Sequence, residues 1–220
     1  VDFLEWLAAD NFTFLGVREY DYSGGESRGR LSRSDQPGLG ILAEPDVRVL
    51  TRGGKGVTMT PEIRAFLMRP EPLTVTKSNL KTRIHREAYA DYIGIKRFHD
   101  DGRLAGEIRF VGLFTSTAYT QSVMNIPYLR GKAHAVMKRA GFSPDGHSGR
   151  ALVNVLESYP RDELFQADLE SLYHAAMAIM ALGVRPRIRV LPRRDRFDRF
   201  VSVLVFVPRE RYDSRVRRRI

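Results

Sequence analysis

The spacing of hydrophobic residues changes near Pro127, and that change limits the folds open to this 220-residue chain. Before Pro127, apolar and polar residues mostly alternate, which is the period of a half-buried β-strand. After it, apolar residues recur every three or four positions, which is the period of an amphipathic helix. The sequence therefore predicts an α+β protein in which a sheet-rich part precedes a helical part.

Residues 1–120 are predicted to form one domain. Strands are expected over 11–22, 39–42, 73–77, 91–98 and 104–114, and short helices over 1–9 and between Thr60 and Pro70. Asp100-Asp101-Gly102 has the composition of a hairpin turn between the last two strands. An antiparallel sheet with helices on one face is the natural packing for this order of elements, which PAS, GAF and profilin-like sensor domains share.

Residues 121–160 are predicted to be a helical connector with helices over 127–140 and 148–158. The segment 161–220 is expected to contain a strand over 163–167, a helix capped by Asp168, strands over 187–193 and 200–207, and a helix that starts at Asp213 or Ser214. This β-α-β-β-α order matches the first five elements of a ferredoxin-like unit, the architecture of ACT domains. We therefore expect a truncated ACT-like domain at 161–220.

Positive charge is concentrated in the last part of the chain. The net charge is +10, and residues 185–220 hold 13 arginines against four acidic residues, an excess of nine. Three interpretations stay open: a nucleic-acid surface, an anionic effector site that includes Arg187 and Arg189, or a solvated face that pairs with acidic surfaces of a partner. Next to the arginines at 193–199, aromatic residues that could stack on bases are limited to Phe197 and Phe200, so the third is favoured and no nucleic acid is expected.

The strand over 200–207 is apolar on both of its faces. Its alternate sets are Phe200, Ser202, Leu204 and Phe206 on one side, and Val201, Val203, Val205 and Val207 on the other. Helices cover only one face of a ferredoxin-like sheet, so the other face would leave an apolar patch in water. We therefore predict that Val203 and Val205 belong to a surface for oligomerisation or domain docking.

No constellation of residues indicates catalysis or a bound cofactor. Cysteine is absent, and the five histidines lack the spacing of a metal site. Gly38-Leu39-Gly40 and Gly53-Gly54-Lys55-Gly56 are incomplete fragments of phosphate-binding motifs, so surface turns are the simpler interpretation. We predict no catalytic, cofactor-binding or metal-binding residue in this chain.

One polar segment between predicted strands is a candidate site for an anionic effector, or else a loop or interdomain contact. Its candidate residues are Lys77, Asn79, Arg83, His85 and Arg86. The chain begins at Val1 with no basic-then-apolar leader and has no apolar run near the roughly 20 residues of a membrane span. Together with the absence of cysteine, this predicts a cytoplasmic protein without membrane contact.

Several stretches, in order along nearly the whole chain, carry a family resemblance. They are ADNFTFLG (9–16), KSN (77–79), HR (85–86), DYIG (91–94), GLFTS (112–116), YPRDELFQ (159–166), RRDRF (193–197) and VPR (207–209). Taken together they resemble the N-terminal, non-catalytic region of the large bacterial NAD-specific glutamate dehydrogenases. One departure is Asp198, where the family pattern has glycine in a turn; aspartate tolerates a positive φ better than most residues, so the hairpin should be kept.

The resemblance implies a regulatory or assembly segment that lies ahead of a catalytic domain, among PAS-like and ACT-like modules. The parent enzyme would oxidatively deaminate L-glutamate to 2-oxoglutarate and ammonia with NAD, while this segment would hold no cofactor. Its expected partners are other domains of the same polypeptide and other subunits of a homo-oligomer, with an amino acid as a possible effector. The alternative from another class is a free-standing sensor module that binds a small molecule.

Overall fold

The chain folds into two compact units. The structure is a computed structural model that describes residues 1–24, 29–44, 46–52, 55–56, 67–84 and 87–219. The first unit consists of Val1–Thr120 together with Arg196–Arg199, and the second of Gln121–Asp195 together with Phe200–Ile220. None of the helices described in either unit combines the length and apolar character needed to cross a membrane.

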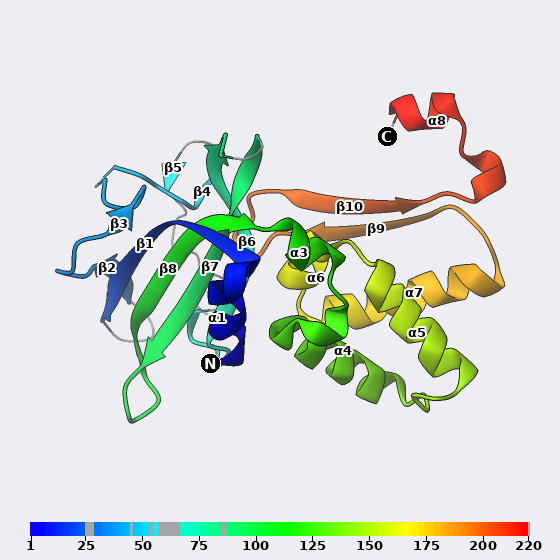
Figure 1. The fold of residues 1–220 in the computed structure, drawn as a ribbon, viewed down its shortest axis with the longest axis horizontal. Helices are drawn as coiled ribbons and strands as arrows, with labels where there is room; N and C mark the ends of the chain where they lie inside the picture. The colour runs from blue at the N-terminus through cyan, green and yellow to red at the C-terminus, as the bar shows by residue number, and fades with distance from the viewer. Residues whose placement is uncertain (25–28, 45, 53–54, 57–66, 85–86, 220) are drawn as a thin grey trace. The chain divides into compact units, whose positions relative to one another are not determined.

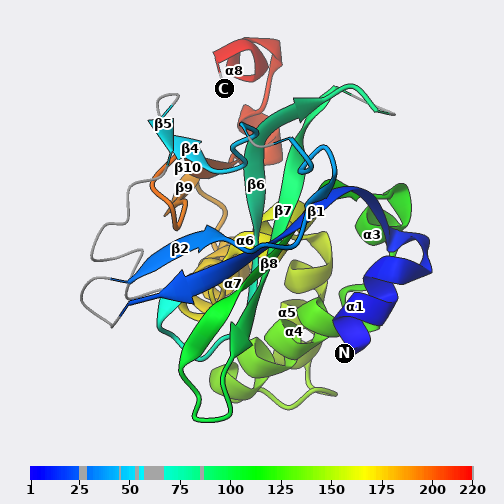
Figure 2. The same ribbon diagram turned by 90° about the vertical axis from the view of Figure 1, so that its left-hand side faces the viewer.

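The first unit is built on an antiparallel sheet (Figure 1 and Figure 2). Its elements are α1 (Asp2–Trp6), a π-type turn η1 (Leu7–Asn11), β1 (Phe12–Ser23), β2 (Arg30–Arg33), β3 (Leu39–Gly40), β4 (Thr51–Arg52), β5 (Lys55–Gly56), β6 (Leu73–Thr82), β7 (Ala88–Phe98), β8 (Leu104–Phe114) and α3 (Ser116–Thr120). The strand order is β2-β1-β8-β7-β6, β3 also pairs with β1, and β4 pairs with β5 in a separate small sheet. The predicted antiparallel sheet is therefore confirmed, while its assignment to the PAS, GAF or profilin-like class stays a prediction.

The predicted hairpin between the last two strands is confirmed. Gly102 has φ +80°, the Gly102 amide donates to the His99 carbonyl at 2.8 Å, and Asp101 Oδ1 accepts the amide of Arg103 at 3.0 Å. The sequence did not predict β2, because Arg-Leu-Ser-Arg lacks the apolar alternation of a buried strand. The helix expected from Thr60 falls almost entirely outside the described residues.

Hydrophobic side chains cover both faces of this sheet. On one face, Phe12 packs edge-on against Phe114 with ring centroids 5.1 Å apart, and Phe14 packs similarly against Phe110. On the other face lie two small buried clusters. The first consists of Leu42, Val49, Ala90, Tyr92 and Val111, and the second of Leu67, Leu104 and Phe197. Members of both clusters, among them Tyr92 and Phe197, line a cavity on this face of the sheet.

The second unit contains helices and a hairpin. Its elements are η2 (Val123–Asn125), α4 (Pro127–Ala140), α5 (His147–Ser158), α6 (Arg161–Gln166), α7 (Leu169–Val184), β9 (Arg189–Arg194), β10 (Val201–Phe206), η3 (Arg209–Arg211) and α8 (Ser214–Arg219). Helices α4, α5 and α7 pack against one another. The predicted caps are confirmed: Asp168 Oδ1 accepts the amide of Ser171 at 2.8 Å, and Asp213 Oδ1 accepts the amide of Val216 at 2.9 Å.

The strand predicted over 163–167 is wrong, because these residues form α6 and the turn that follows it. Pro160 precedes the helix, and Asp162 and Glu163 in its first turn interact favourably with the helix dipole. Leu164 and Phe165 are both buried in this helix. The segment from 161 therefore has the order helix-helix-strand-strand-helix, and β9 and β10 form a two-stranded sheet.

The hairpin turn confirms the prediction made for Asp198. This residue has φ +55°, in the left-handed region that glycine would adopt more readily. The Asp195 amide donates to the Phe200 carbonyl at 2.9 Å and closes the turn. The strands continue in register, with Val203 opposite Pro192 and Val205 opposite Val190.

Candidate functional site

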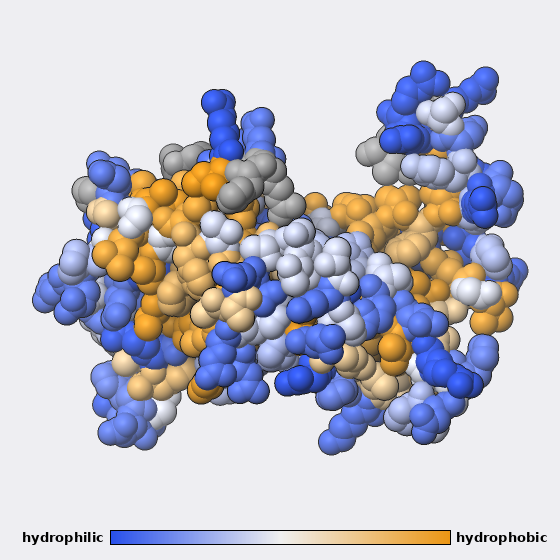
Figure 3. Space-filling model, in the orientation of Figure 1, coloured by the Kyte–Doolittle hydropathy of each residue, from blue (hydrophilic) through white to orange (hydrophobic). Residues whose placement is uncertain are grey.

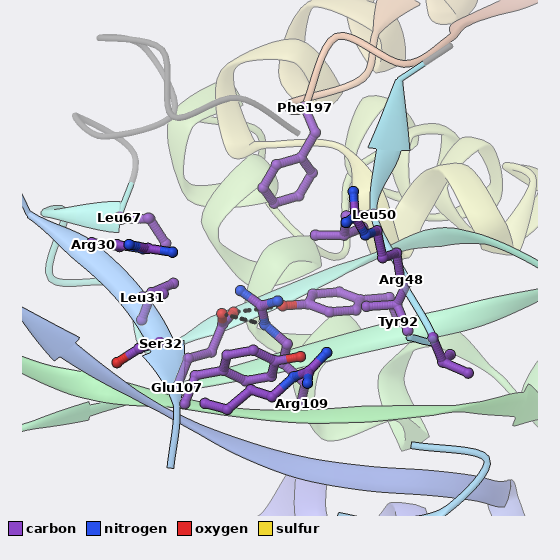
Figure 4. A pocket seen from close by; sticks show the side chains of 14 residues that line it. Arg30, Leu31, Ser32, Arg48, Leu50, Leu67, Tyr92, Glu107, Arg109 and Phe197 are labelled. Atoms are coloured by element: carbon purple, nitrogen blue, oxygen red, sulfur yellow. Dashed lines mark hydrogen bonds and ion pairs between the residues drawn. The ribbon is translucent and has the colours of Figure 1, made fainter. Parts of the chain in front are cut away.

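The first unit contains a cavity of about 600 Å³ on one face of its sheet (Figure 4). Strands β1, β2, β7 and β8 form part of its wall, the segment 47–50 forms another part, and Leu67 and Phe197 complete it. Small-molecule sites in proteins occupy roughly 300–1,000 Å³, so the cavity has the size of a ligand site.

Three side chains of the sheet form a buried hydrogen-bonded network in this cavity. The Tyr92 hydroxyl donates to Glu107 Oε1 at 2.7 Å, and Arg109 Nε donates to Glu107 Oε2 at 2.8 Å. Tyr92 is fully buried and Glu107 is 3% exposed. The Arg109 guanidinium also stacks on Tyr20, 4.0 Å from the ring centroid. Figure 4 shows the three side chains pointing toward one another from the sheet.

The network keeps Tyr92 and Arg109 protonated. Burial raises the pKa of the Tyr92 hydroxyl well above its usual value of 10.0, although Arg109 opposes this shift. Burial works against the charged form of Arg109, but Tyr92 and Glu107 raise its pKa above its usual value. At neutral pH, Tyr92 therefore remains a hydrogen-bond donor and Arg109 remains a cation.

Lys96 lies beside this network as the cross-strand partner of Glu107. Burial lowers its pKa from 10.5 to about 8, although Glu71 and Glu107 oppose the shift. Its Nζ donates to the Arg69 carbonyl at 2.9 Å. Lys96 therefore contributes a group whose charge changes in mildly alkaline solution.

Gly94 leaves room for the network. A Cβ atom at this position would lie 2.2 Å from Glu107 Oε1 and 2.9 Å from the Tyr92 hydroxyl. Both atoms are held by hydrogen bonds in a buried site, so neither can move aside without losing a partner. The glycine of the DYIG motif is thus explained by close packing at the cavity wall.

The rest of the lining divides into an apolar wall and a basic margin. The apolar wall consists of Leu31, Val47, Val49, Leu50, Leu67 and Phe197. Arg30, Arg33 and Arg48 are exposed at the margin. Among the described residues that line the cavity, Glu107 is the one carboxylate, so cations outnumber anions there.

The site residues predicted from the sequence do not include Tyr92, Glu107 or Arg109. A signal was present: Glu107 and Arg109 occupy alternate positions of a predicted strand, on the face that Val111 also occupies. Charged residues on the buried face of a strand require partners. The partner Tyr92 lies on the neighbouring strand, and strand pairing could be read only from the fold.

The predicted effector segment lies mainly on β6. Lys77 Nζ forms an ion pair with Asp91 at 2.6 Å, Asn79 Oδ1 accepts from Arg199 at 3.3 Å, and Arg83 is exposed. His85 and Arg86 lie outside the described residues. Lys77 and Asn79 thus make structural contacts within the first unit, and an effector role for this segment stays a prediction.

The arginines of the basic hairpin have different surroundings. Arg193 donates to both oxygens of Glu163, and Arg199 donates to the Lys77 carbonyl at 2.6 Å and to Thr76 Oγ1 at 2.9 Å. Arg187 and Arg189 are exposed, and Arg189 begins β9 while Arg187 precedes it. Some of the arginines in this basic segment, such as Arg193 and Arg199, are therefore paired with groups of the same chain.

One face of the β9–β10 hairpin is apolar and exposed. Val190, Val201 and Val203 are 51%, 59% and 50% exposed, and Val205 is half-buried on the same face. Ile188, just before β9, is also exposed. Figure 3 shows hydrophobic side chains gathered along these two strands. We call Ile188, Val190, Val201, Val203 and Val205 the hairpin face.

No group of three or more histidine or carboxylate side chains suited to hold a metal ion occurs among the described residues, and the chain has no cysteine. Within the described strands of the first unit, every pairing is antiparallel. Dinucleotides are commonly bound at the carboxyl ends of parallel strands, before a helix N-terminus. The described sheet is of a different kind.

Two family models match the second half of the chain. Residues 126–185 match the model described as glutamate dehydrogenase, helical motif 1. Residues 189–220 match the model described as glutamate dehydrogenase, ACT2 domain, which fits the predicted ACT-like region. The helical match runs through α7, and the ACT2 match begins at β9.

Whole-chain comparisons agree with these matches. The NAD-specific glutamate dehydrogenase of Halomonas elongata is 44% identical over 222 residues, which cover 100% of this chain and 14% of that protein. The corresponding protein of Pseudomonas aeruginosa is 39% identical, with 99% of this chain and 13% of that protein covered. The one from Mycobacterium tuberculosis is 29% identical, with 98% and 12% covered. The chain thus spans a small fraction of the length of these relatives.

Proposed function

Because this chain belongs to the NAD-specific glutamate dehydrogenase family, as its motifs predicted, we propose that it is a non-catalytic assembly and regulatory segment of such an enzyme. The parent enzyme would convert L-glutamate, NAD and water to 2-oxoglutarate, ammonia and NADH. The segment would lie ahead of the catalytic domain, in a cytoplasmic homo-oligomer. The proposal also includes a PAS-like assignment for the first unit.

The exposed hairpin face carries this proposal. Three valines that are each about half exposed on one side of a two-stranded sheet form an apolar patch, and such patches on proteins mark interaction surfaces. A two-stranded hairpin is marginally stable on its own, and three or more strands or a packed partner are usually needed. The patch lies in the part of the chain that matches the ACT2 model.

We assign this surface to another part of the same enzyme, one with an apolar centre and an acidic rim. Arg194 lies opposite Val201 on this face and is exposed, so a second copy of the same hairpin would bring like charges together. An acidic rim would complement this arginine. The relatives also contain several times more chain than this segment, which supplies surfaces for such a contact.

The antiparallel sheet supports a non-catalytic role, because it differs from the parallel architecture that commonly binds NAD. The test is a spectrophotometric assay of the 220-residue chain with L-glutamate and NAD, beside the full-length Halomonas elongata enzyme as a positive control. We expect NADH formation by the full-length enzyme and none by the segment. If the segment forms NADH, and denaturing the segment abolishes this activity, the proposal is wrong.

Sedimentation velocity of the same chain tests the assigned occupant. We expect a monomer for the wild type and for Val203→Glu and Val205→Glu. Val184→Glu is the matched control, because Val184 is 90% exposed at the end of α7 and lies outside the hairpin face. Self-association that Val203→Glu abolishes and Val184→Glu preserves would assign the face to a second copy instead.

The cavity of the first unit favours a second candidate function, a module that senses a small molecule. A free-standing sensor and a segment of a dehydrogenase differ in the length of the polypeptide that contains them. The size of the protein in its native cells, detected with an antibody against this segment, distinguishes the two. A band near 25.1 kDa would favour the free-standing sensor.

A further inference from the structure

We propose that the cavity of the first unit binds an organic carboxylate with an apolar body and no ammonium group. The proposal is independent of the docking role of the hairpin face. It depends on the position of Arg109, on the hydrogen bonds that Glu107 already accepts, and on the apolar wall that the described residues form opposite both.

Arg109 is prepared to bind an anion. Its Nε is hydrogen-bonded to Glu107 and its guanidinium plane is stacked on Tyr20, so the side chain is held in one orientation. In the described part of the chain, Glu107 is its one hydrogen-bonding partner, which leaves the two terminal nitrogens as donors at the cavity wall. A planar guanidinium group with two parallel donors matches a carboxylate.

The surroundings strengthen the preference for an anion. Arg30, Arg33 and Arg48 line the margin of the same cavity and are exposed. Their charges raise the local concentration of anions near the opening. Figure 4 shows Arg30 and Arg48 at the cavity together with Arg109.

The described lining offers an ammonium group no carboxylate other than Glu107. Both oxygens of Glu107 already accept hydrogen bonds, one from Tyr92 and one from Arg109. No second carboxylate occurs among the described residues of the lining. An amino acid would bring an ammonium group next to several arginines with no second carboxylate in the described lining to offset the repulsion, which costs affinity.

The apolar wall accepts the body of the ligand. Leu31, Leu50, Leu67 and Phe197 lie across the cavity from the network, and Phe197 points into it (Figure 4). An aromatic or branched aliphatic body would bury its surface there, at about 25 cal/mol per Å² of apolar area. A volume of about 600 Å³ accommodates such a molecule.

Three probes with one skeleton test the proposal by isothermal titration calorimetry on the 220-residue chain. They are 3-phenylpropanoate, which has the carboxylate alone, L-phenylalanine, which adds an ammonium group, and 3-phenylpropylamine, which has the amine alone. We expect 3-phenylpropanoate to bind about tenfold or more tightly than L-phenylalanine, and 3-phenylpropylamine not to bind. Equal or tighter binding of L-phenylalanine, or no binding of 3-phenylpropanoate at millimolar concentration, would overturn the proposal.

Variants locate the binding. Arg109→Met should weaken 3-phenylpropanoate binding about tenfold or more, whereas Arg109→Lys, which keeps the charge but loses the planar fork, should weaken it less. Arg103→Met is the matched control, because Arg103 is an exposed arginine of the same unit whose ion pair is with Asp101, away from the cavity.

A cooperative melting transition for each variant establishes that it folds. If Arg109→Met fails to fold, Arg48→Ala at the exposed margin should still weaken binding while Arg103→Met does not. The proposal is contradicted if a folded Arg109→Met variant binds 3-phenylpropanoate as tightly as the wild type. It is also contradicted if the single variants Arg48→Ala and Arg109→Lys both keep the wild-type affinity.

Discussion

Removing one partner of the Arg193–Glu163 ion pair should destabilise the second unit strongly. Arg193 Nε donates to Glu163 Oε2 at 2.6 Å and its terminal nitrogen donates to Oε1 at 2.9 Å, so the contact is bidentate. The two side chains are only 12% and 10% exposed. The pair joins β9 to α6. Arg193 therefore lies on the side of the hairpin that contacts α6, and the hairpin face lies on the opposite side.

The magnitude follows from burial. Breaking a buried ion pair by removing one partner costs about 3–5 kcal/mol, because the remaining charge is left without compensation. Arg193→Met keeps an unbranched apolar side chain and leaves the Glu163 carboxylate beside Tyr159, whose pKa is raised by burial and by that carboxylate. The double variant Arg193→Met/Glu163→Leu removes both charges and should recover most of the loss.

The assay is urea unfolding of the 220-residue chain, followed by circular dichroism at the helical band. Arg139→Met is the control, because the Arg139–Glu170 pair has the same chemistry but both side chains are exposed to water. We expect a loss for Arg193→Met that far exceeds that of the control, with recovery in the double variant. Equal small losses for both single variants would refute the reasoning that burial makes the difference.

Three further variants test other parts of the structure. The Glu157 carboxylate accepts hydrogen bonds from the Ser122 hydroxyl and the Val123 amide, and these bonds lower its pKa despite its partial burial. Glu157→Ala should therefore lower the free energy of unfolding in urea by about 1–2 kcal/mol at neutral pH, and this loss should shrink as the pH falls through the folded-state pKa. Burial lowers the pKa of Lys96 to about 8, so the unfolded chain binds a proton that the folded chain releases, and stability should rise between about pH 8 and 10 in the wild type but not in Lys96→Met. Gly94→Ala should cost about 1–3 kcal/mol in thermal unfolding, because its Cβ would lie 2.2 Å from Glu107 Oε1, and a neutral outcome would mean that the network is not fixed.

Local signals predicted most elements of the fold. Alternating residues indicated β1, β7, β8 and β10, and capping residues such as Asp168 indicated the helix starts. Asp198 kept its turn with a positive φ, as expected for an aspartate in place of glycine. These features depend on a few neighbouring residues, which a sequence displays directly.

The errors arose where contacts between residues far apart in the sequence determine the structure. The segment 163–167 contains apolar residues at strand-like density, but it forms α6 and the turn after it, where Lys132 of α4 donates to the carbonyls of Leu164, Phe165 and Ala167. The arginines of the hairpin looked alike in sequence, yet Arg193 and Arg199 have specific partners while Arg187 and Arg189 are exposed. Only pairing across the fold distinguishes them.

The candidate cavity shows the same limit. Glu107 and Arg109 could be recognised as charged residues on a buried strand face, but their meeting with Tyr92 depends on the pairing of β7 with β8. Phe197 reaches the cavity from a turn more than eighty residues away in the sequence. The sequence offers the segment from Lys77 to Arg86 instead, as a candidate effector site or else a loop or interdomain contact, because its polar residues are adjacent in the chain.

The most direct test of the assembly role is the solvent access of the hairpin face in the segment and in a full-length enzyme of this family. The chain has no cysteine, so Val203→Cys introduces a single thiol, and Val184→Cys provides an exposed control. Labelling with iodoacetamide, located by mass spectrometry, should be fast at both thiols in the 220-residue chain. In the full-length protein we predict that the thiol at position 203 is protected while the one at 184 is labelled. Equally fast labelling at position 203 in both proteins would contradict docking of the hairpin face.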